Sequence, residues 1–210
     1  MQHVSIDARA ENRQRTRDGL VDAAIGILSD EGIHRLTAAR VASAASVSRR
    51  TFFNYFAQVE DLLVAIAERA TAEIVEELLS RPADEPLLDA LKGTLEVLLE
   101  SETFDRVELL GRAAMAEPQM KRVLLVITDS QTAAFEEGLH SRLGANADPA
   151  YVAALAAASA AVFSRTMRLS VEVIAADDDE AKERQRDWVR RAFTHLFAGF
   201  DESGAYIQAD

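Results

Sequence analysis

The chain contains no cysteine, which excludes a disulfide framework, a thiolate zinc site and a cysteine nucleophile. Its 210 residues include only four prolines and nine glycines, too few for a loop-rich β-fold or a disordered chain. The first ten residues are polar and lack the apolar core of a signal peptide. With 49% hydrophobic and 28% charged residues, the composition is that of an ordinary globular protein, and we expect a cytoplasmic one.

The net charge of -12 is distributed unevenly along the chain. Residues 1–70 hold nine Lys+Arg and nine Asp+Glu, so all of the excess acid lies in residues 71–210. Within the first part, the stretch from Gly32 to Val59 carries four arginines and no acid. Phosphate binding depends on local charge, so this stretch is compatible with a nucleic-acid surface. Charge alone favours a plainer interpretation, a solvated basic surface.

Apolar residues recur at helical spacing almost throughout, without strand-like alternation, repeats or low-complexity segments. This pattern predicts an all-α fold. The predicted helices cover residues 8–31, 37–44, 49–56, 58–80, 85–101, 103–116, 118–143, 149–175 and 180–200.

An uncharged run of 16 residues extends from Pro149 to Ser164. A membrane span needs about 20 apolar residues, and Arg165 and Arg168 interrupt the run, so we expect no membrane segment. A helix that is apolar on all sides must be buried, and a second subunit is a natural way to bury it.

Residues 36–63 read LTAARVASAASVSRRTFFNYFAQVEDLL. Thr37 and Ser48 are in the N-cap positions of two short helices joined by a tight turn, which is helix-turn-helix architecture. Phe52 and Phe56, four residues apart, lie on the inward face of the second helix. The outward side chains suit base edges and phosphates. They are Arg49, Arg50, Thr51, Asn54 and Tyr55.

This stretch resembles the N-terminal domain of the TetR (tetracycline-repressor) family, over about residues 13–66. The resemblance implies a nine-helix architecture, with a helix-turn-helix domain at residues 1–57 and a ligand-binding and dimerisation domain at residues 58–210. The helix at about 58–80 connects them. It also implies a homodimeric repressor that binds a double-stranded DNA operator and is released by a small molecule, without enzymatic activity, cofactor or metal.

The resemblance also implies individual roles for the DNA-binding residues. Thr37, Thr51 and Tyr55 would bind phosphates, Arg49 and Arg50 would reach base edges, and Asn54 could do either. Arg13 and Arg17 would reach DNA as an arm. Three positions depart from the family pattern. Ser46 replaces a turn glycine, Phe53 replaces a tyrosine, and Val59 replaces a lysine at a helix start whose backbone N–H groups could still bind phosphate.

In the family, the last two helices dimerise, which here places the dimer interface at about residues 149–200. The apolar residues between the helices are candidates for a ligand pocket, although most such residues belong to a plain core. The pocket candidates are Phe104, Leu110, Met115, Leu124, Ile127, Phe135, Phe163, Arg165, Met167 and Arg168.

Arg165 and Arg168 lie three apart on an otherwise apolar helix, and a buried arginine needs an anionic partner. That partner could be Glu172, a carboxylate across the dimer, or an anionic ligand, and we favour an internal salt bridge. Residues 142–158 also resemble the C-terminal domain of actinobacterial TetR regulators that are thought to bind acyl-CoA-like ligands. This implies a lipophilic, anionic effector.

Two other functions compete with a DNA-binding regulator. One is a small-molecule-binding dimer whose DNA domain is vestigial, which the changes at Phe53 and Val59 favour slightly. The other is an enzyme on a helical scaffold, which ranks last because no nucleophile–base pair or metal-ligand spacing is present. The acidic run from Asp177 to Glu180 lacks the spaced oxygens of a Ca²⁺ loop and suits a helix N-terminus instead.

Overall fold

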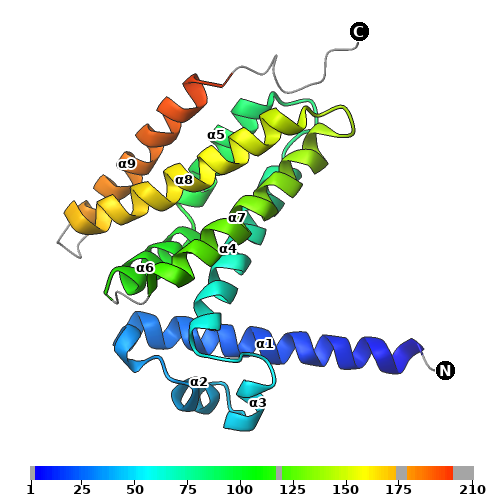
Figure 1. Cartoon of the computed structure of the whole chain (residues 1–210), viewed down its shortest axis with the longest axis vertical. Helices are drawn as coiled ribbons and strands as arrows, with labels where there is room; N and C mark the ends of the chain where they lie inside the picture. Colours follow the sequence, from blue (N-terminus) through cyan, green and yellow to red (C-terminus); the bar gives the residue numbers. More distant parts are fainter. Residues whose placement is uncertain (1–2, 117–119, 174–178, 201–210) are drawn as a thin grey trace. The chain divides into compact units, whose positions relative to one another are not determined.

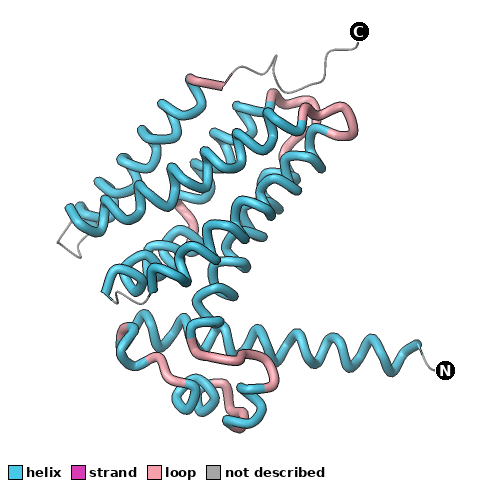
Figure 2. The backbone as a smooth tube through the Cα atoms, viewed as in Figure 1, coloured by secondary structure: helices cyan, strands magenta, loops and turns pink. Residues whose placement is uncertain are grey.

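A computed structural model describes residues 3–116, 120–173 and 179–200, and every regular element within these ranges is a helix (Figures 1 and 2). The all-α prediction is therefore confirmed. The elements are α1 (His3–Glu31), the 3-10 helix η1 (Ile33–Arg35), α2 (Ala38–Ala44), α3 (Arg49–Phe53), α4 (Glu60–Ser80), α5 (Leu87–Leu99), α6 (Glu102–Ala116), α7 (Met120–Leu143), α8 (Pro149–Val173) and α9 (Asp179–Ala198).

The chain divides into two compact units, Met1–Ile66 and Ala67–Asp210, and the boundary falls within α4. In the first unit, α1 packs on η1 and α2, and α2 packs on α3. Leu20 of α1, Val41 of α2 and Phe52 of α3 are fully buried and form its core. Gly32 ends α1 with a positive φ of 80°, a conformation that glycine adopts without a Cβ clash.

Two helix boundaries differ from the predictions by three residues or more. Helix α1 begins at His3, five residues before the predicted start, whereas α3 ends at Phe53 although apolar spacing continues to Phe56. Beyond Phe53 the Tyr55 N–H bonds the Phe52 carbonyl three residues back, so the chain tightens into a turn. The predicted start of α7 at Pro118 lies outside the described residues, as do Asp177 and Asp178 of the acidic run.

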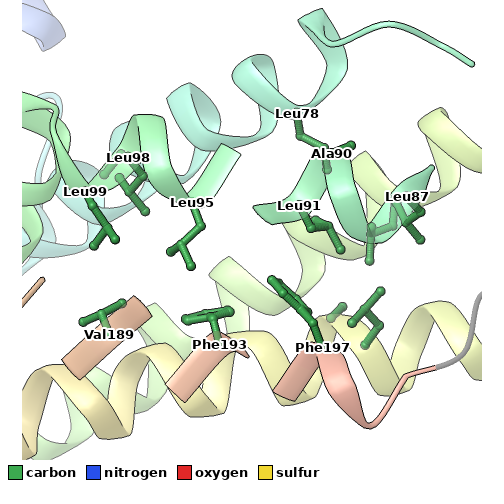
Figure 3. Close-up of a cluster of buried hydrophobic side chains, with 14 of the residues drawn as sticks. Leu78, Leu87, Ala90, Leu91, Leu95, Leu98, Leu99, Val189, Phe193 and Phe197 are labelled. Carbon is green, nitrogen blue, oxygen red and sulfur yellow. The ribbon is translucent and has the colours of Figure 1, made fainter. Parts of the chain in front are cut away.

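The core of the second unit lies between α5 and α9, with α4, α6, α7 and α8 around it. Leu91 and Leu95 of α5 point toward Phe193 and Phe197 of α9 (Figure 3). Apolar residues at helical spacing on both helices make this arrangement favourable, since each apolar stripe buries the other.

Helix α8 packs against α7 on one side and α9 on the other (Figure 1). Within the described residues it is the one helix long and apolar enough for a membrane span, with a mean hydropathy of 1.3 over Pro149–Leu169. However, Val152, Leu155 and Ala156 are buried among the other helices of this unit. The apolar character of α8 thus serves at least partly to build this core.

Arg142, near the end of α7, holds the C-terminal end of α4 and the loop after it. Its Nη1 donates to the carbonyls of Leu78 and Arg81 at 3.1 and 3.3 Å, and its Nη2 donates to those of Pro82 and Glu85 at 2.8 and 3.1 Å. These carbonyls lack helical partners because α4 ends at Ser80. One guanidinium therefore satisfies four acceptors from a segment about sixty residues earlier.

Replacing Arg142 with methionine keeps most of the aliphatic stem but removes all four donors. We expect the free energy of unfolding to fall by about 2 kcal/mol, since hydrogen bonds to charged groups contribute about 1.5–3 kcal/mol and these sites are partly solvated. Urea unfolding followed by circular dichroism measures the change. Arg142→Lys should recover only part of the loss, because an ammonium cannot span four carbonyls. An unchanged urea midpoint for the methionine variant would contradict this role.

Candidate DNA interface and ligand cavity

The tight turn between α2 and α3 is fixed by two side-chain caps. Thr37 Oγ1 accepts the N–H of Arg40 at 3.3 Å, and Ser48 Oγ accepts the N–H of Thr51 at 3.0 Å. Both predicted N-caps are confirmed. Between the helices, Ser46 has a φ of 56° and is the one non-glycine residue with positive φ in the described part of the chain.

None of the side chains predicted to contact DNA in α3 and the turn after it is buried. Arg49, Arg50 and Asn54 are exposed, and Thr51 and Tyr55 are half-buried. Neither Arg49 nor Arg50 forms an ion pair with any residue that the structure describes. Arg40, by contrast, is bound by Glu31. The guanidinium groups of α3 are therefore available to an external anion.

Thr37 is also exposed, although its hydroxyl is engaged in the cap. The hydroxyl of Thr51 lies 2.8 Å from that of Ser48. Because a hydroxyl that accepts one hydrogen bond can still donate another, Thr37 and Thr51 remain able to reach a phosphate.

Arg13 and Arg17 of α1 lie beside the end of α3. The guanidinium carbon of Arg13 is 5.8 Å from the ring centroid of Tyr55, and that of Arg17 is 5.6 Å from the ring centroid of Phe56. Cation–π contacts of this kind fix a long side chain without consuming its N–H donors. Within the first unit, Arg13 is thus brought onto the same side as Tyr55.

The expected phosphate site at the start of α4 is not supported. Asp61 Oδ2 accepts the N–H groups of Ala57 and Gln58 at 2.9 and 3.1 Å. Glu60 and Asp61 also place two acids in the first turn, where they complement the helix dipole. Val59 lacks the positive charge of the usual lysine. The Asp61 carboxylate already accepts two backbone N–H groups at this position, and both carboxylates would repel a phosphate.

The second unit contains a partly open cavity of about 90 Å³, lined by residues of five helices. None of the side chains that line it is charged, and most are aliphatic or aromatic. The lining residues are Thr71 and Ile74 of α4, Leu91, Thr94, Leu95 and Leu98 of α5, Gln131 and Phe135 of α7, Ser159, Ala160 and Phe163 of α8, and Phe193 and Phe197 of α9.

Of the predicted pocket residues, Phe135 and Phe163 line this cavity. Phe104 is 1% exposed and belongs to the hydrophobic core, Leu110 and Ile127 are buried, and Leu124 is half-buried elsewhere on α7. Met167 is buried against Gln185 of α9, whose Nε2 lies 3.8 Å from its sulfur. The side chain of Met115 lies outside the described residues. Apolar periodicity identified inward faces but could not separate core from cavity.

The prediction that Arg165 and Arg168 are buried needs correction. Arg165 is exposed and Arg168 is half-buried, and neither lines the cavity. Arg168 Nε is shielded from solvent and has no hydrogen-bond partner among the described residues. The side chain of Glu172, the partner favoured from sequence, lies outside the described residues. Arg165 lies on the face of α8 that the chain itself leaves uncovered.

Sequence reasoning also missed Thr94 and Ser159, two buried hydroxyl residues in the cavity wall. The sequence could have indicated them, because each is a hydroxyl residue among apolar residues on the inward face of its helix. Gln131, which also lines the cavity, was not among the predicted ligand contacts.

Comparison with known proteins bears on the first unit most directly. Residues 20–66 match the family described as bacterial regulatory proteins, tetR family. The HTH-type transcriptional regulator TcmR of Streptomyces glaucescens is 31% identical over 91 residues, which are 43% of this chain and 40% of TcmR. Over its first unit, the chain is therefore similar to TetR-family regulators. Its match spans about two-fifths of the length of that curated relative.

Solved TetR-family structures extend the likeness to the whole fold. A TetR-family transcriptional regulator from Streptomyces coelicolor superposes with a TM-score of 0.56 at 20% identity, covering 91% of this chain and 85% of the other. The multidrug binding protein EbrR, complexed with imidazole, gives a TM-score of 0.52 at 25% identity, covering 84% and 93%. The nine-helix TetR architecture expected from sequence is therefore confirmed.

Within the TetR family the turn position held by Ser46 is usually glycine, and the structure gives the reason in its positive φ. An L-residue there costs roughly 1–2 kcal/mol, offset in part by the larger unfolded-state entropy of glycine. Ser46→Gly should therefore stabilise the first unit by about 0.5–1 kcal/mol. Thermal unfolding of the full chain tests this, with Ser46→Ala as a control that should show no gain. A glycine variant less stable than wild type would refute the strain argument.

Proposed function

We propose that this protein is a homodimeric, cytoplasmic DNA-binding repressor whose operator affinity is set by a small molecule bound in the second unit. The observation that carries the proposal is that Arg49 and Arg50 are exposed and form no ion pair with the described residues, on a helix capped by Ser48. In a dimer, two such helices would enter successive major grooves about 34–36 Å apart.

The dimer part of the proposal rests on α8. Only 33% of its most apolar window is buried within the chain. Its exposed positions form one stripe of small residues, Ala150, Ala154, Ala157 and Ala161, followed by Arg165. Small side chains let a second helix approach closely, so a second copy of this chain is the natural cover.

The effector part of the proposal rests on the cavity, which has the apolar lining and few polar groups typical of ligand sites. The similar protein EbrR is described as a multidrug binding protein, which agrees with a ligand-binding role for this architecture. An acyl-CoA-like effector remains the class that the C-terminal sequence resemblance favours. Arg165 and Arg168 would be its phosphate contacts, although both lie outside the cavity wall.

A second candidate function, a ligand-binding dimer with vestigial DNA binding, is favoured by the carboxylates at the start of α4. One titration separates the two functions. Labelled DNA from upstream of the protein's own gene is followed by fluorescence anisotropy at several salt concentrations. A regulator should bind with nanomolar affinity and a steep negative salt slope, because each phosphate contact releases a counterion. Weak binding that does not distinguish this DNA from an unrelated fragment would favour the second candidate.

A further inference from the structure

The hydroxyls of Thr94 and Ser159 are unusual among the hydroxyl groups of this chain. Both residues are almost fully buried, at 3% and 5% exposed, and neither Thr94 Oγ1 nor Ser159 Oγ has a hydrogen-bond partner in the described part of the protein. A buried hydroxyl without a partner costs about 1–3 kcal/mol. Two such groups on residues that line one cavity therefore call for an explanation.

Other threonines within helices show how this chain normally satisfies a hydroxyl. Six of them donate to the carbonyl four residues earlier, at 2.7–2.9 Å. They include Thr71, which lines the same cavity and donates to the Ala67 carbonyl at 2.9 Å. The same local bond is open to Thr94 and Ser159 in principle, yet both leave it unmade. Their hydroxyls thus have no partner among the described residues, on two side chains that line the cavity, and a small shift of the wall would let a ligand reach them.

The cavity wall restricts the charge of that partner. No Asp, Glu, Lys, Arg or His contributes to the wall. A charged group brought into such a site would lose its hydration without gaining an opposite charge, which costs several kcal/mol. The wall thus disfavours both anions and organic cations.

The cavity volume and the phenyl rings in its wall restrict the size and shape of the ligand. A cavity of about 90 Å³ is smaller than the engineered cavity of about 150 Å³ that binds benzene, so it holds at most one ring, and the wall must shift outward to admit it. Phe193 lies between two other phenyl rings, with centroids 6.4 Å from Phe163 and 5.5 Å from Phe197. These edges and faces suit a flat ring.

We propose that the cavity binds a small, uncharged ring compound through a hydroxyl or carbonyl oxygen that hydrogen-bonds to Thr94 and Ser159. Any effect of this ligand on operator affinity rests on the proposed function, whereas its binding to the cavity can be measured without DNA. It assigns the effector to a neutral class and removes the need for Arg165 and Arg168 as ligand contacts.

The test uses four probes of similar size and the full-length protein without DNA. Phenol carries the hydroxyl, toluene lacks it, benzoate is an anion and benzylammonium is a cation. Titration calorimetry should show binding of phenol several-fold tighter than toluene and none of either ion. In the Thr94→Val, Ser159→Ala double variant, phenol should lose about ten-fold in affinity while toluene is unaffected, as expected for two neutral hydrogen bonds.

The same double variant gives a readout that needs no ligand. Removing two unsatisfied hydroxyls should raise its urea midpoint above that of wild type, whereas Thr71→Val, which removes a satisfied hydroxyl from the same wall, should lower it. Equal affinity for phenol and toluene, no binding of phenol, or binding of benzoate as tight as that of phenol would each overturn the proposal. Phenol binding that requires both hydroxyls but leaves the DNA complex intact would sustain it and instead refute the proposed ligand control of DNA binding.

Discussion

Replacing both Arg49 and Arg50 with alanine should reduce the affinity for the operator by about a hundred-fold or more. Each bidentate arginine–base contact contributes about 1–3 kcal/mol of discrimination, so two lost contacts remove roughly 2–6 kcal/mol. Both side chains are exposed and unpaired in the described structure, so their removal leaves no buried charge and should not unfold the domain. Anisotropy with operator DNA and with a scrambled fragment measures the loss of affinity and specificity together.

The control for this variant must remove the same charge elsewhere. Lys92 and Arg122 are exposed residues of the second unit, so the Lys92→Ala, Arg122→Ala double variant lowers the net charge by the same two units. Its operator affinity should stay within a few-fold of wild type, because phosphate binding depends on local charge. If the Arg49, Arg50 variant retains specific binding at wild-type strength, α3 is not the recognition helix.

Local sequence signals predicted the DNA-binding unit well because its geometry is local. The caps at Thr37 and Ser48 depend on a hydroxyl three residues before the N–H that it accepts, and both were found where the sequence placed them. The positive φ of Ser46 followed from the glycine that relatives carry in that turn. Helix ends were less predictable, as α3 shows, because apolar spacing continues through Phe56 after the helix has ended.

The cavity could not be predicted in the same way, because its walls come from helices far apart in the sequence. Phe104 and Phe135 have the same apolar character and helical spacing, yet one fills the core and the other borders empty space. That difference depends on how closely helices approach. Gly138 illustrates this, since a Cβ there would lie 2.8 Å from Val75 Cγ1, so α4 and α7 meet where a side chain is missing. A sequence pattern does not report such distances.

Arg165 and Arg168 of α8 were expected to be buried and are not. Apolar neighbours led to the expectation that Arg165 is buried, but burial on a helix depends on which face its neighbours cover. Counting back from Arg165 in steps of four, four, three and four gives the exposed alanines of the same face. The alanine stripe is visible in the sequence. The contacts of α8 with α7 and α9 were needed to show that these helices leave the stripe exposed to solvent.

Replacing Ala157 with arginine should convert the dimer to a monomer at micromolar concentration. Ala157 is exposed and central in the stripe that runs from Ala150 to Ala161, where a second α8 would have to approach closely. A long cationic side chain there both blocks that approach and loses hydration without a partner. Size-exclusion chromatography with light scattering reads the mass directly. Ala133→Arg, the same change at an exposed alanine of α7, should leave the dimer intact.

The monomer should also lose operator affinity although its DNA-binding unit is unchanged. Two linked recognition helices bind a two-fold site more tightly than one by about 10²–10⁴, because the second contact is intramolecular. The Ala157→Arg variant should therefore bind a full operator about a hundred-fold more weakly than wild type, while binding a single half-site as wild type does. A dimer that survives this substitution would exclude the α8 stripe as the interface. A monomer with full operator affinity would separate dimerisation from DNA binding and refute the two-helix geometry.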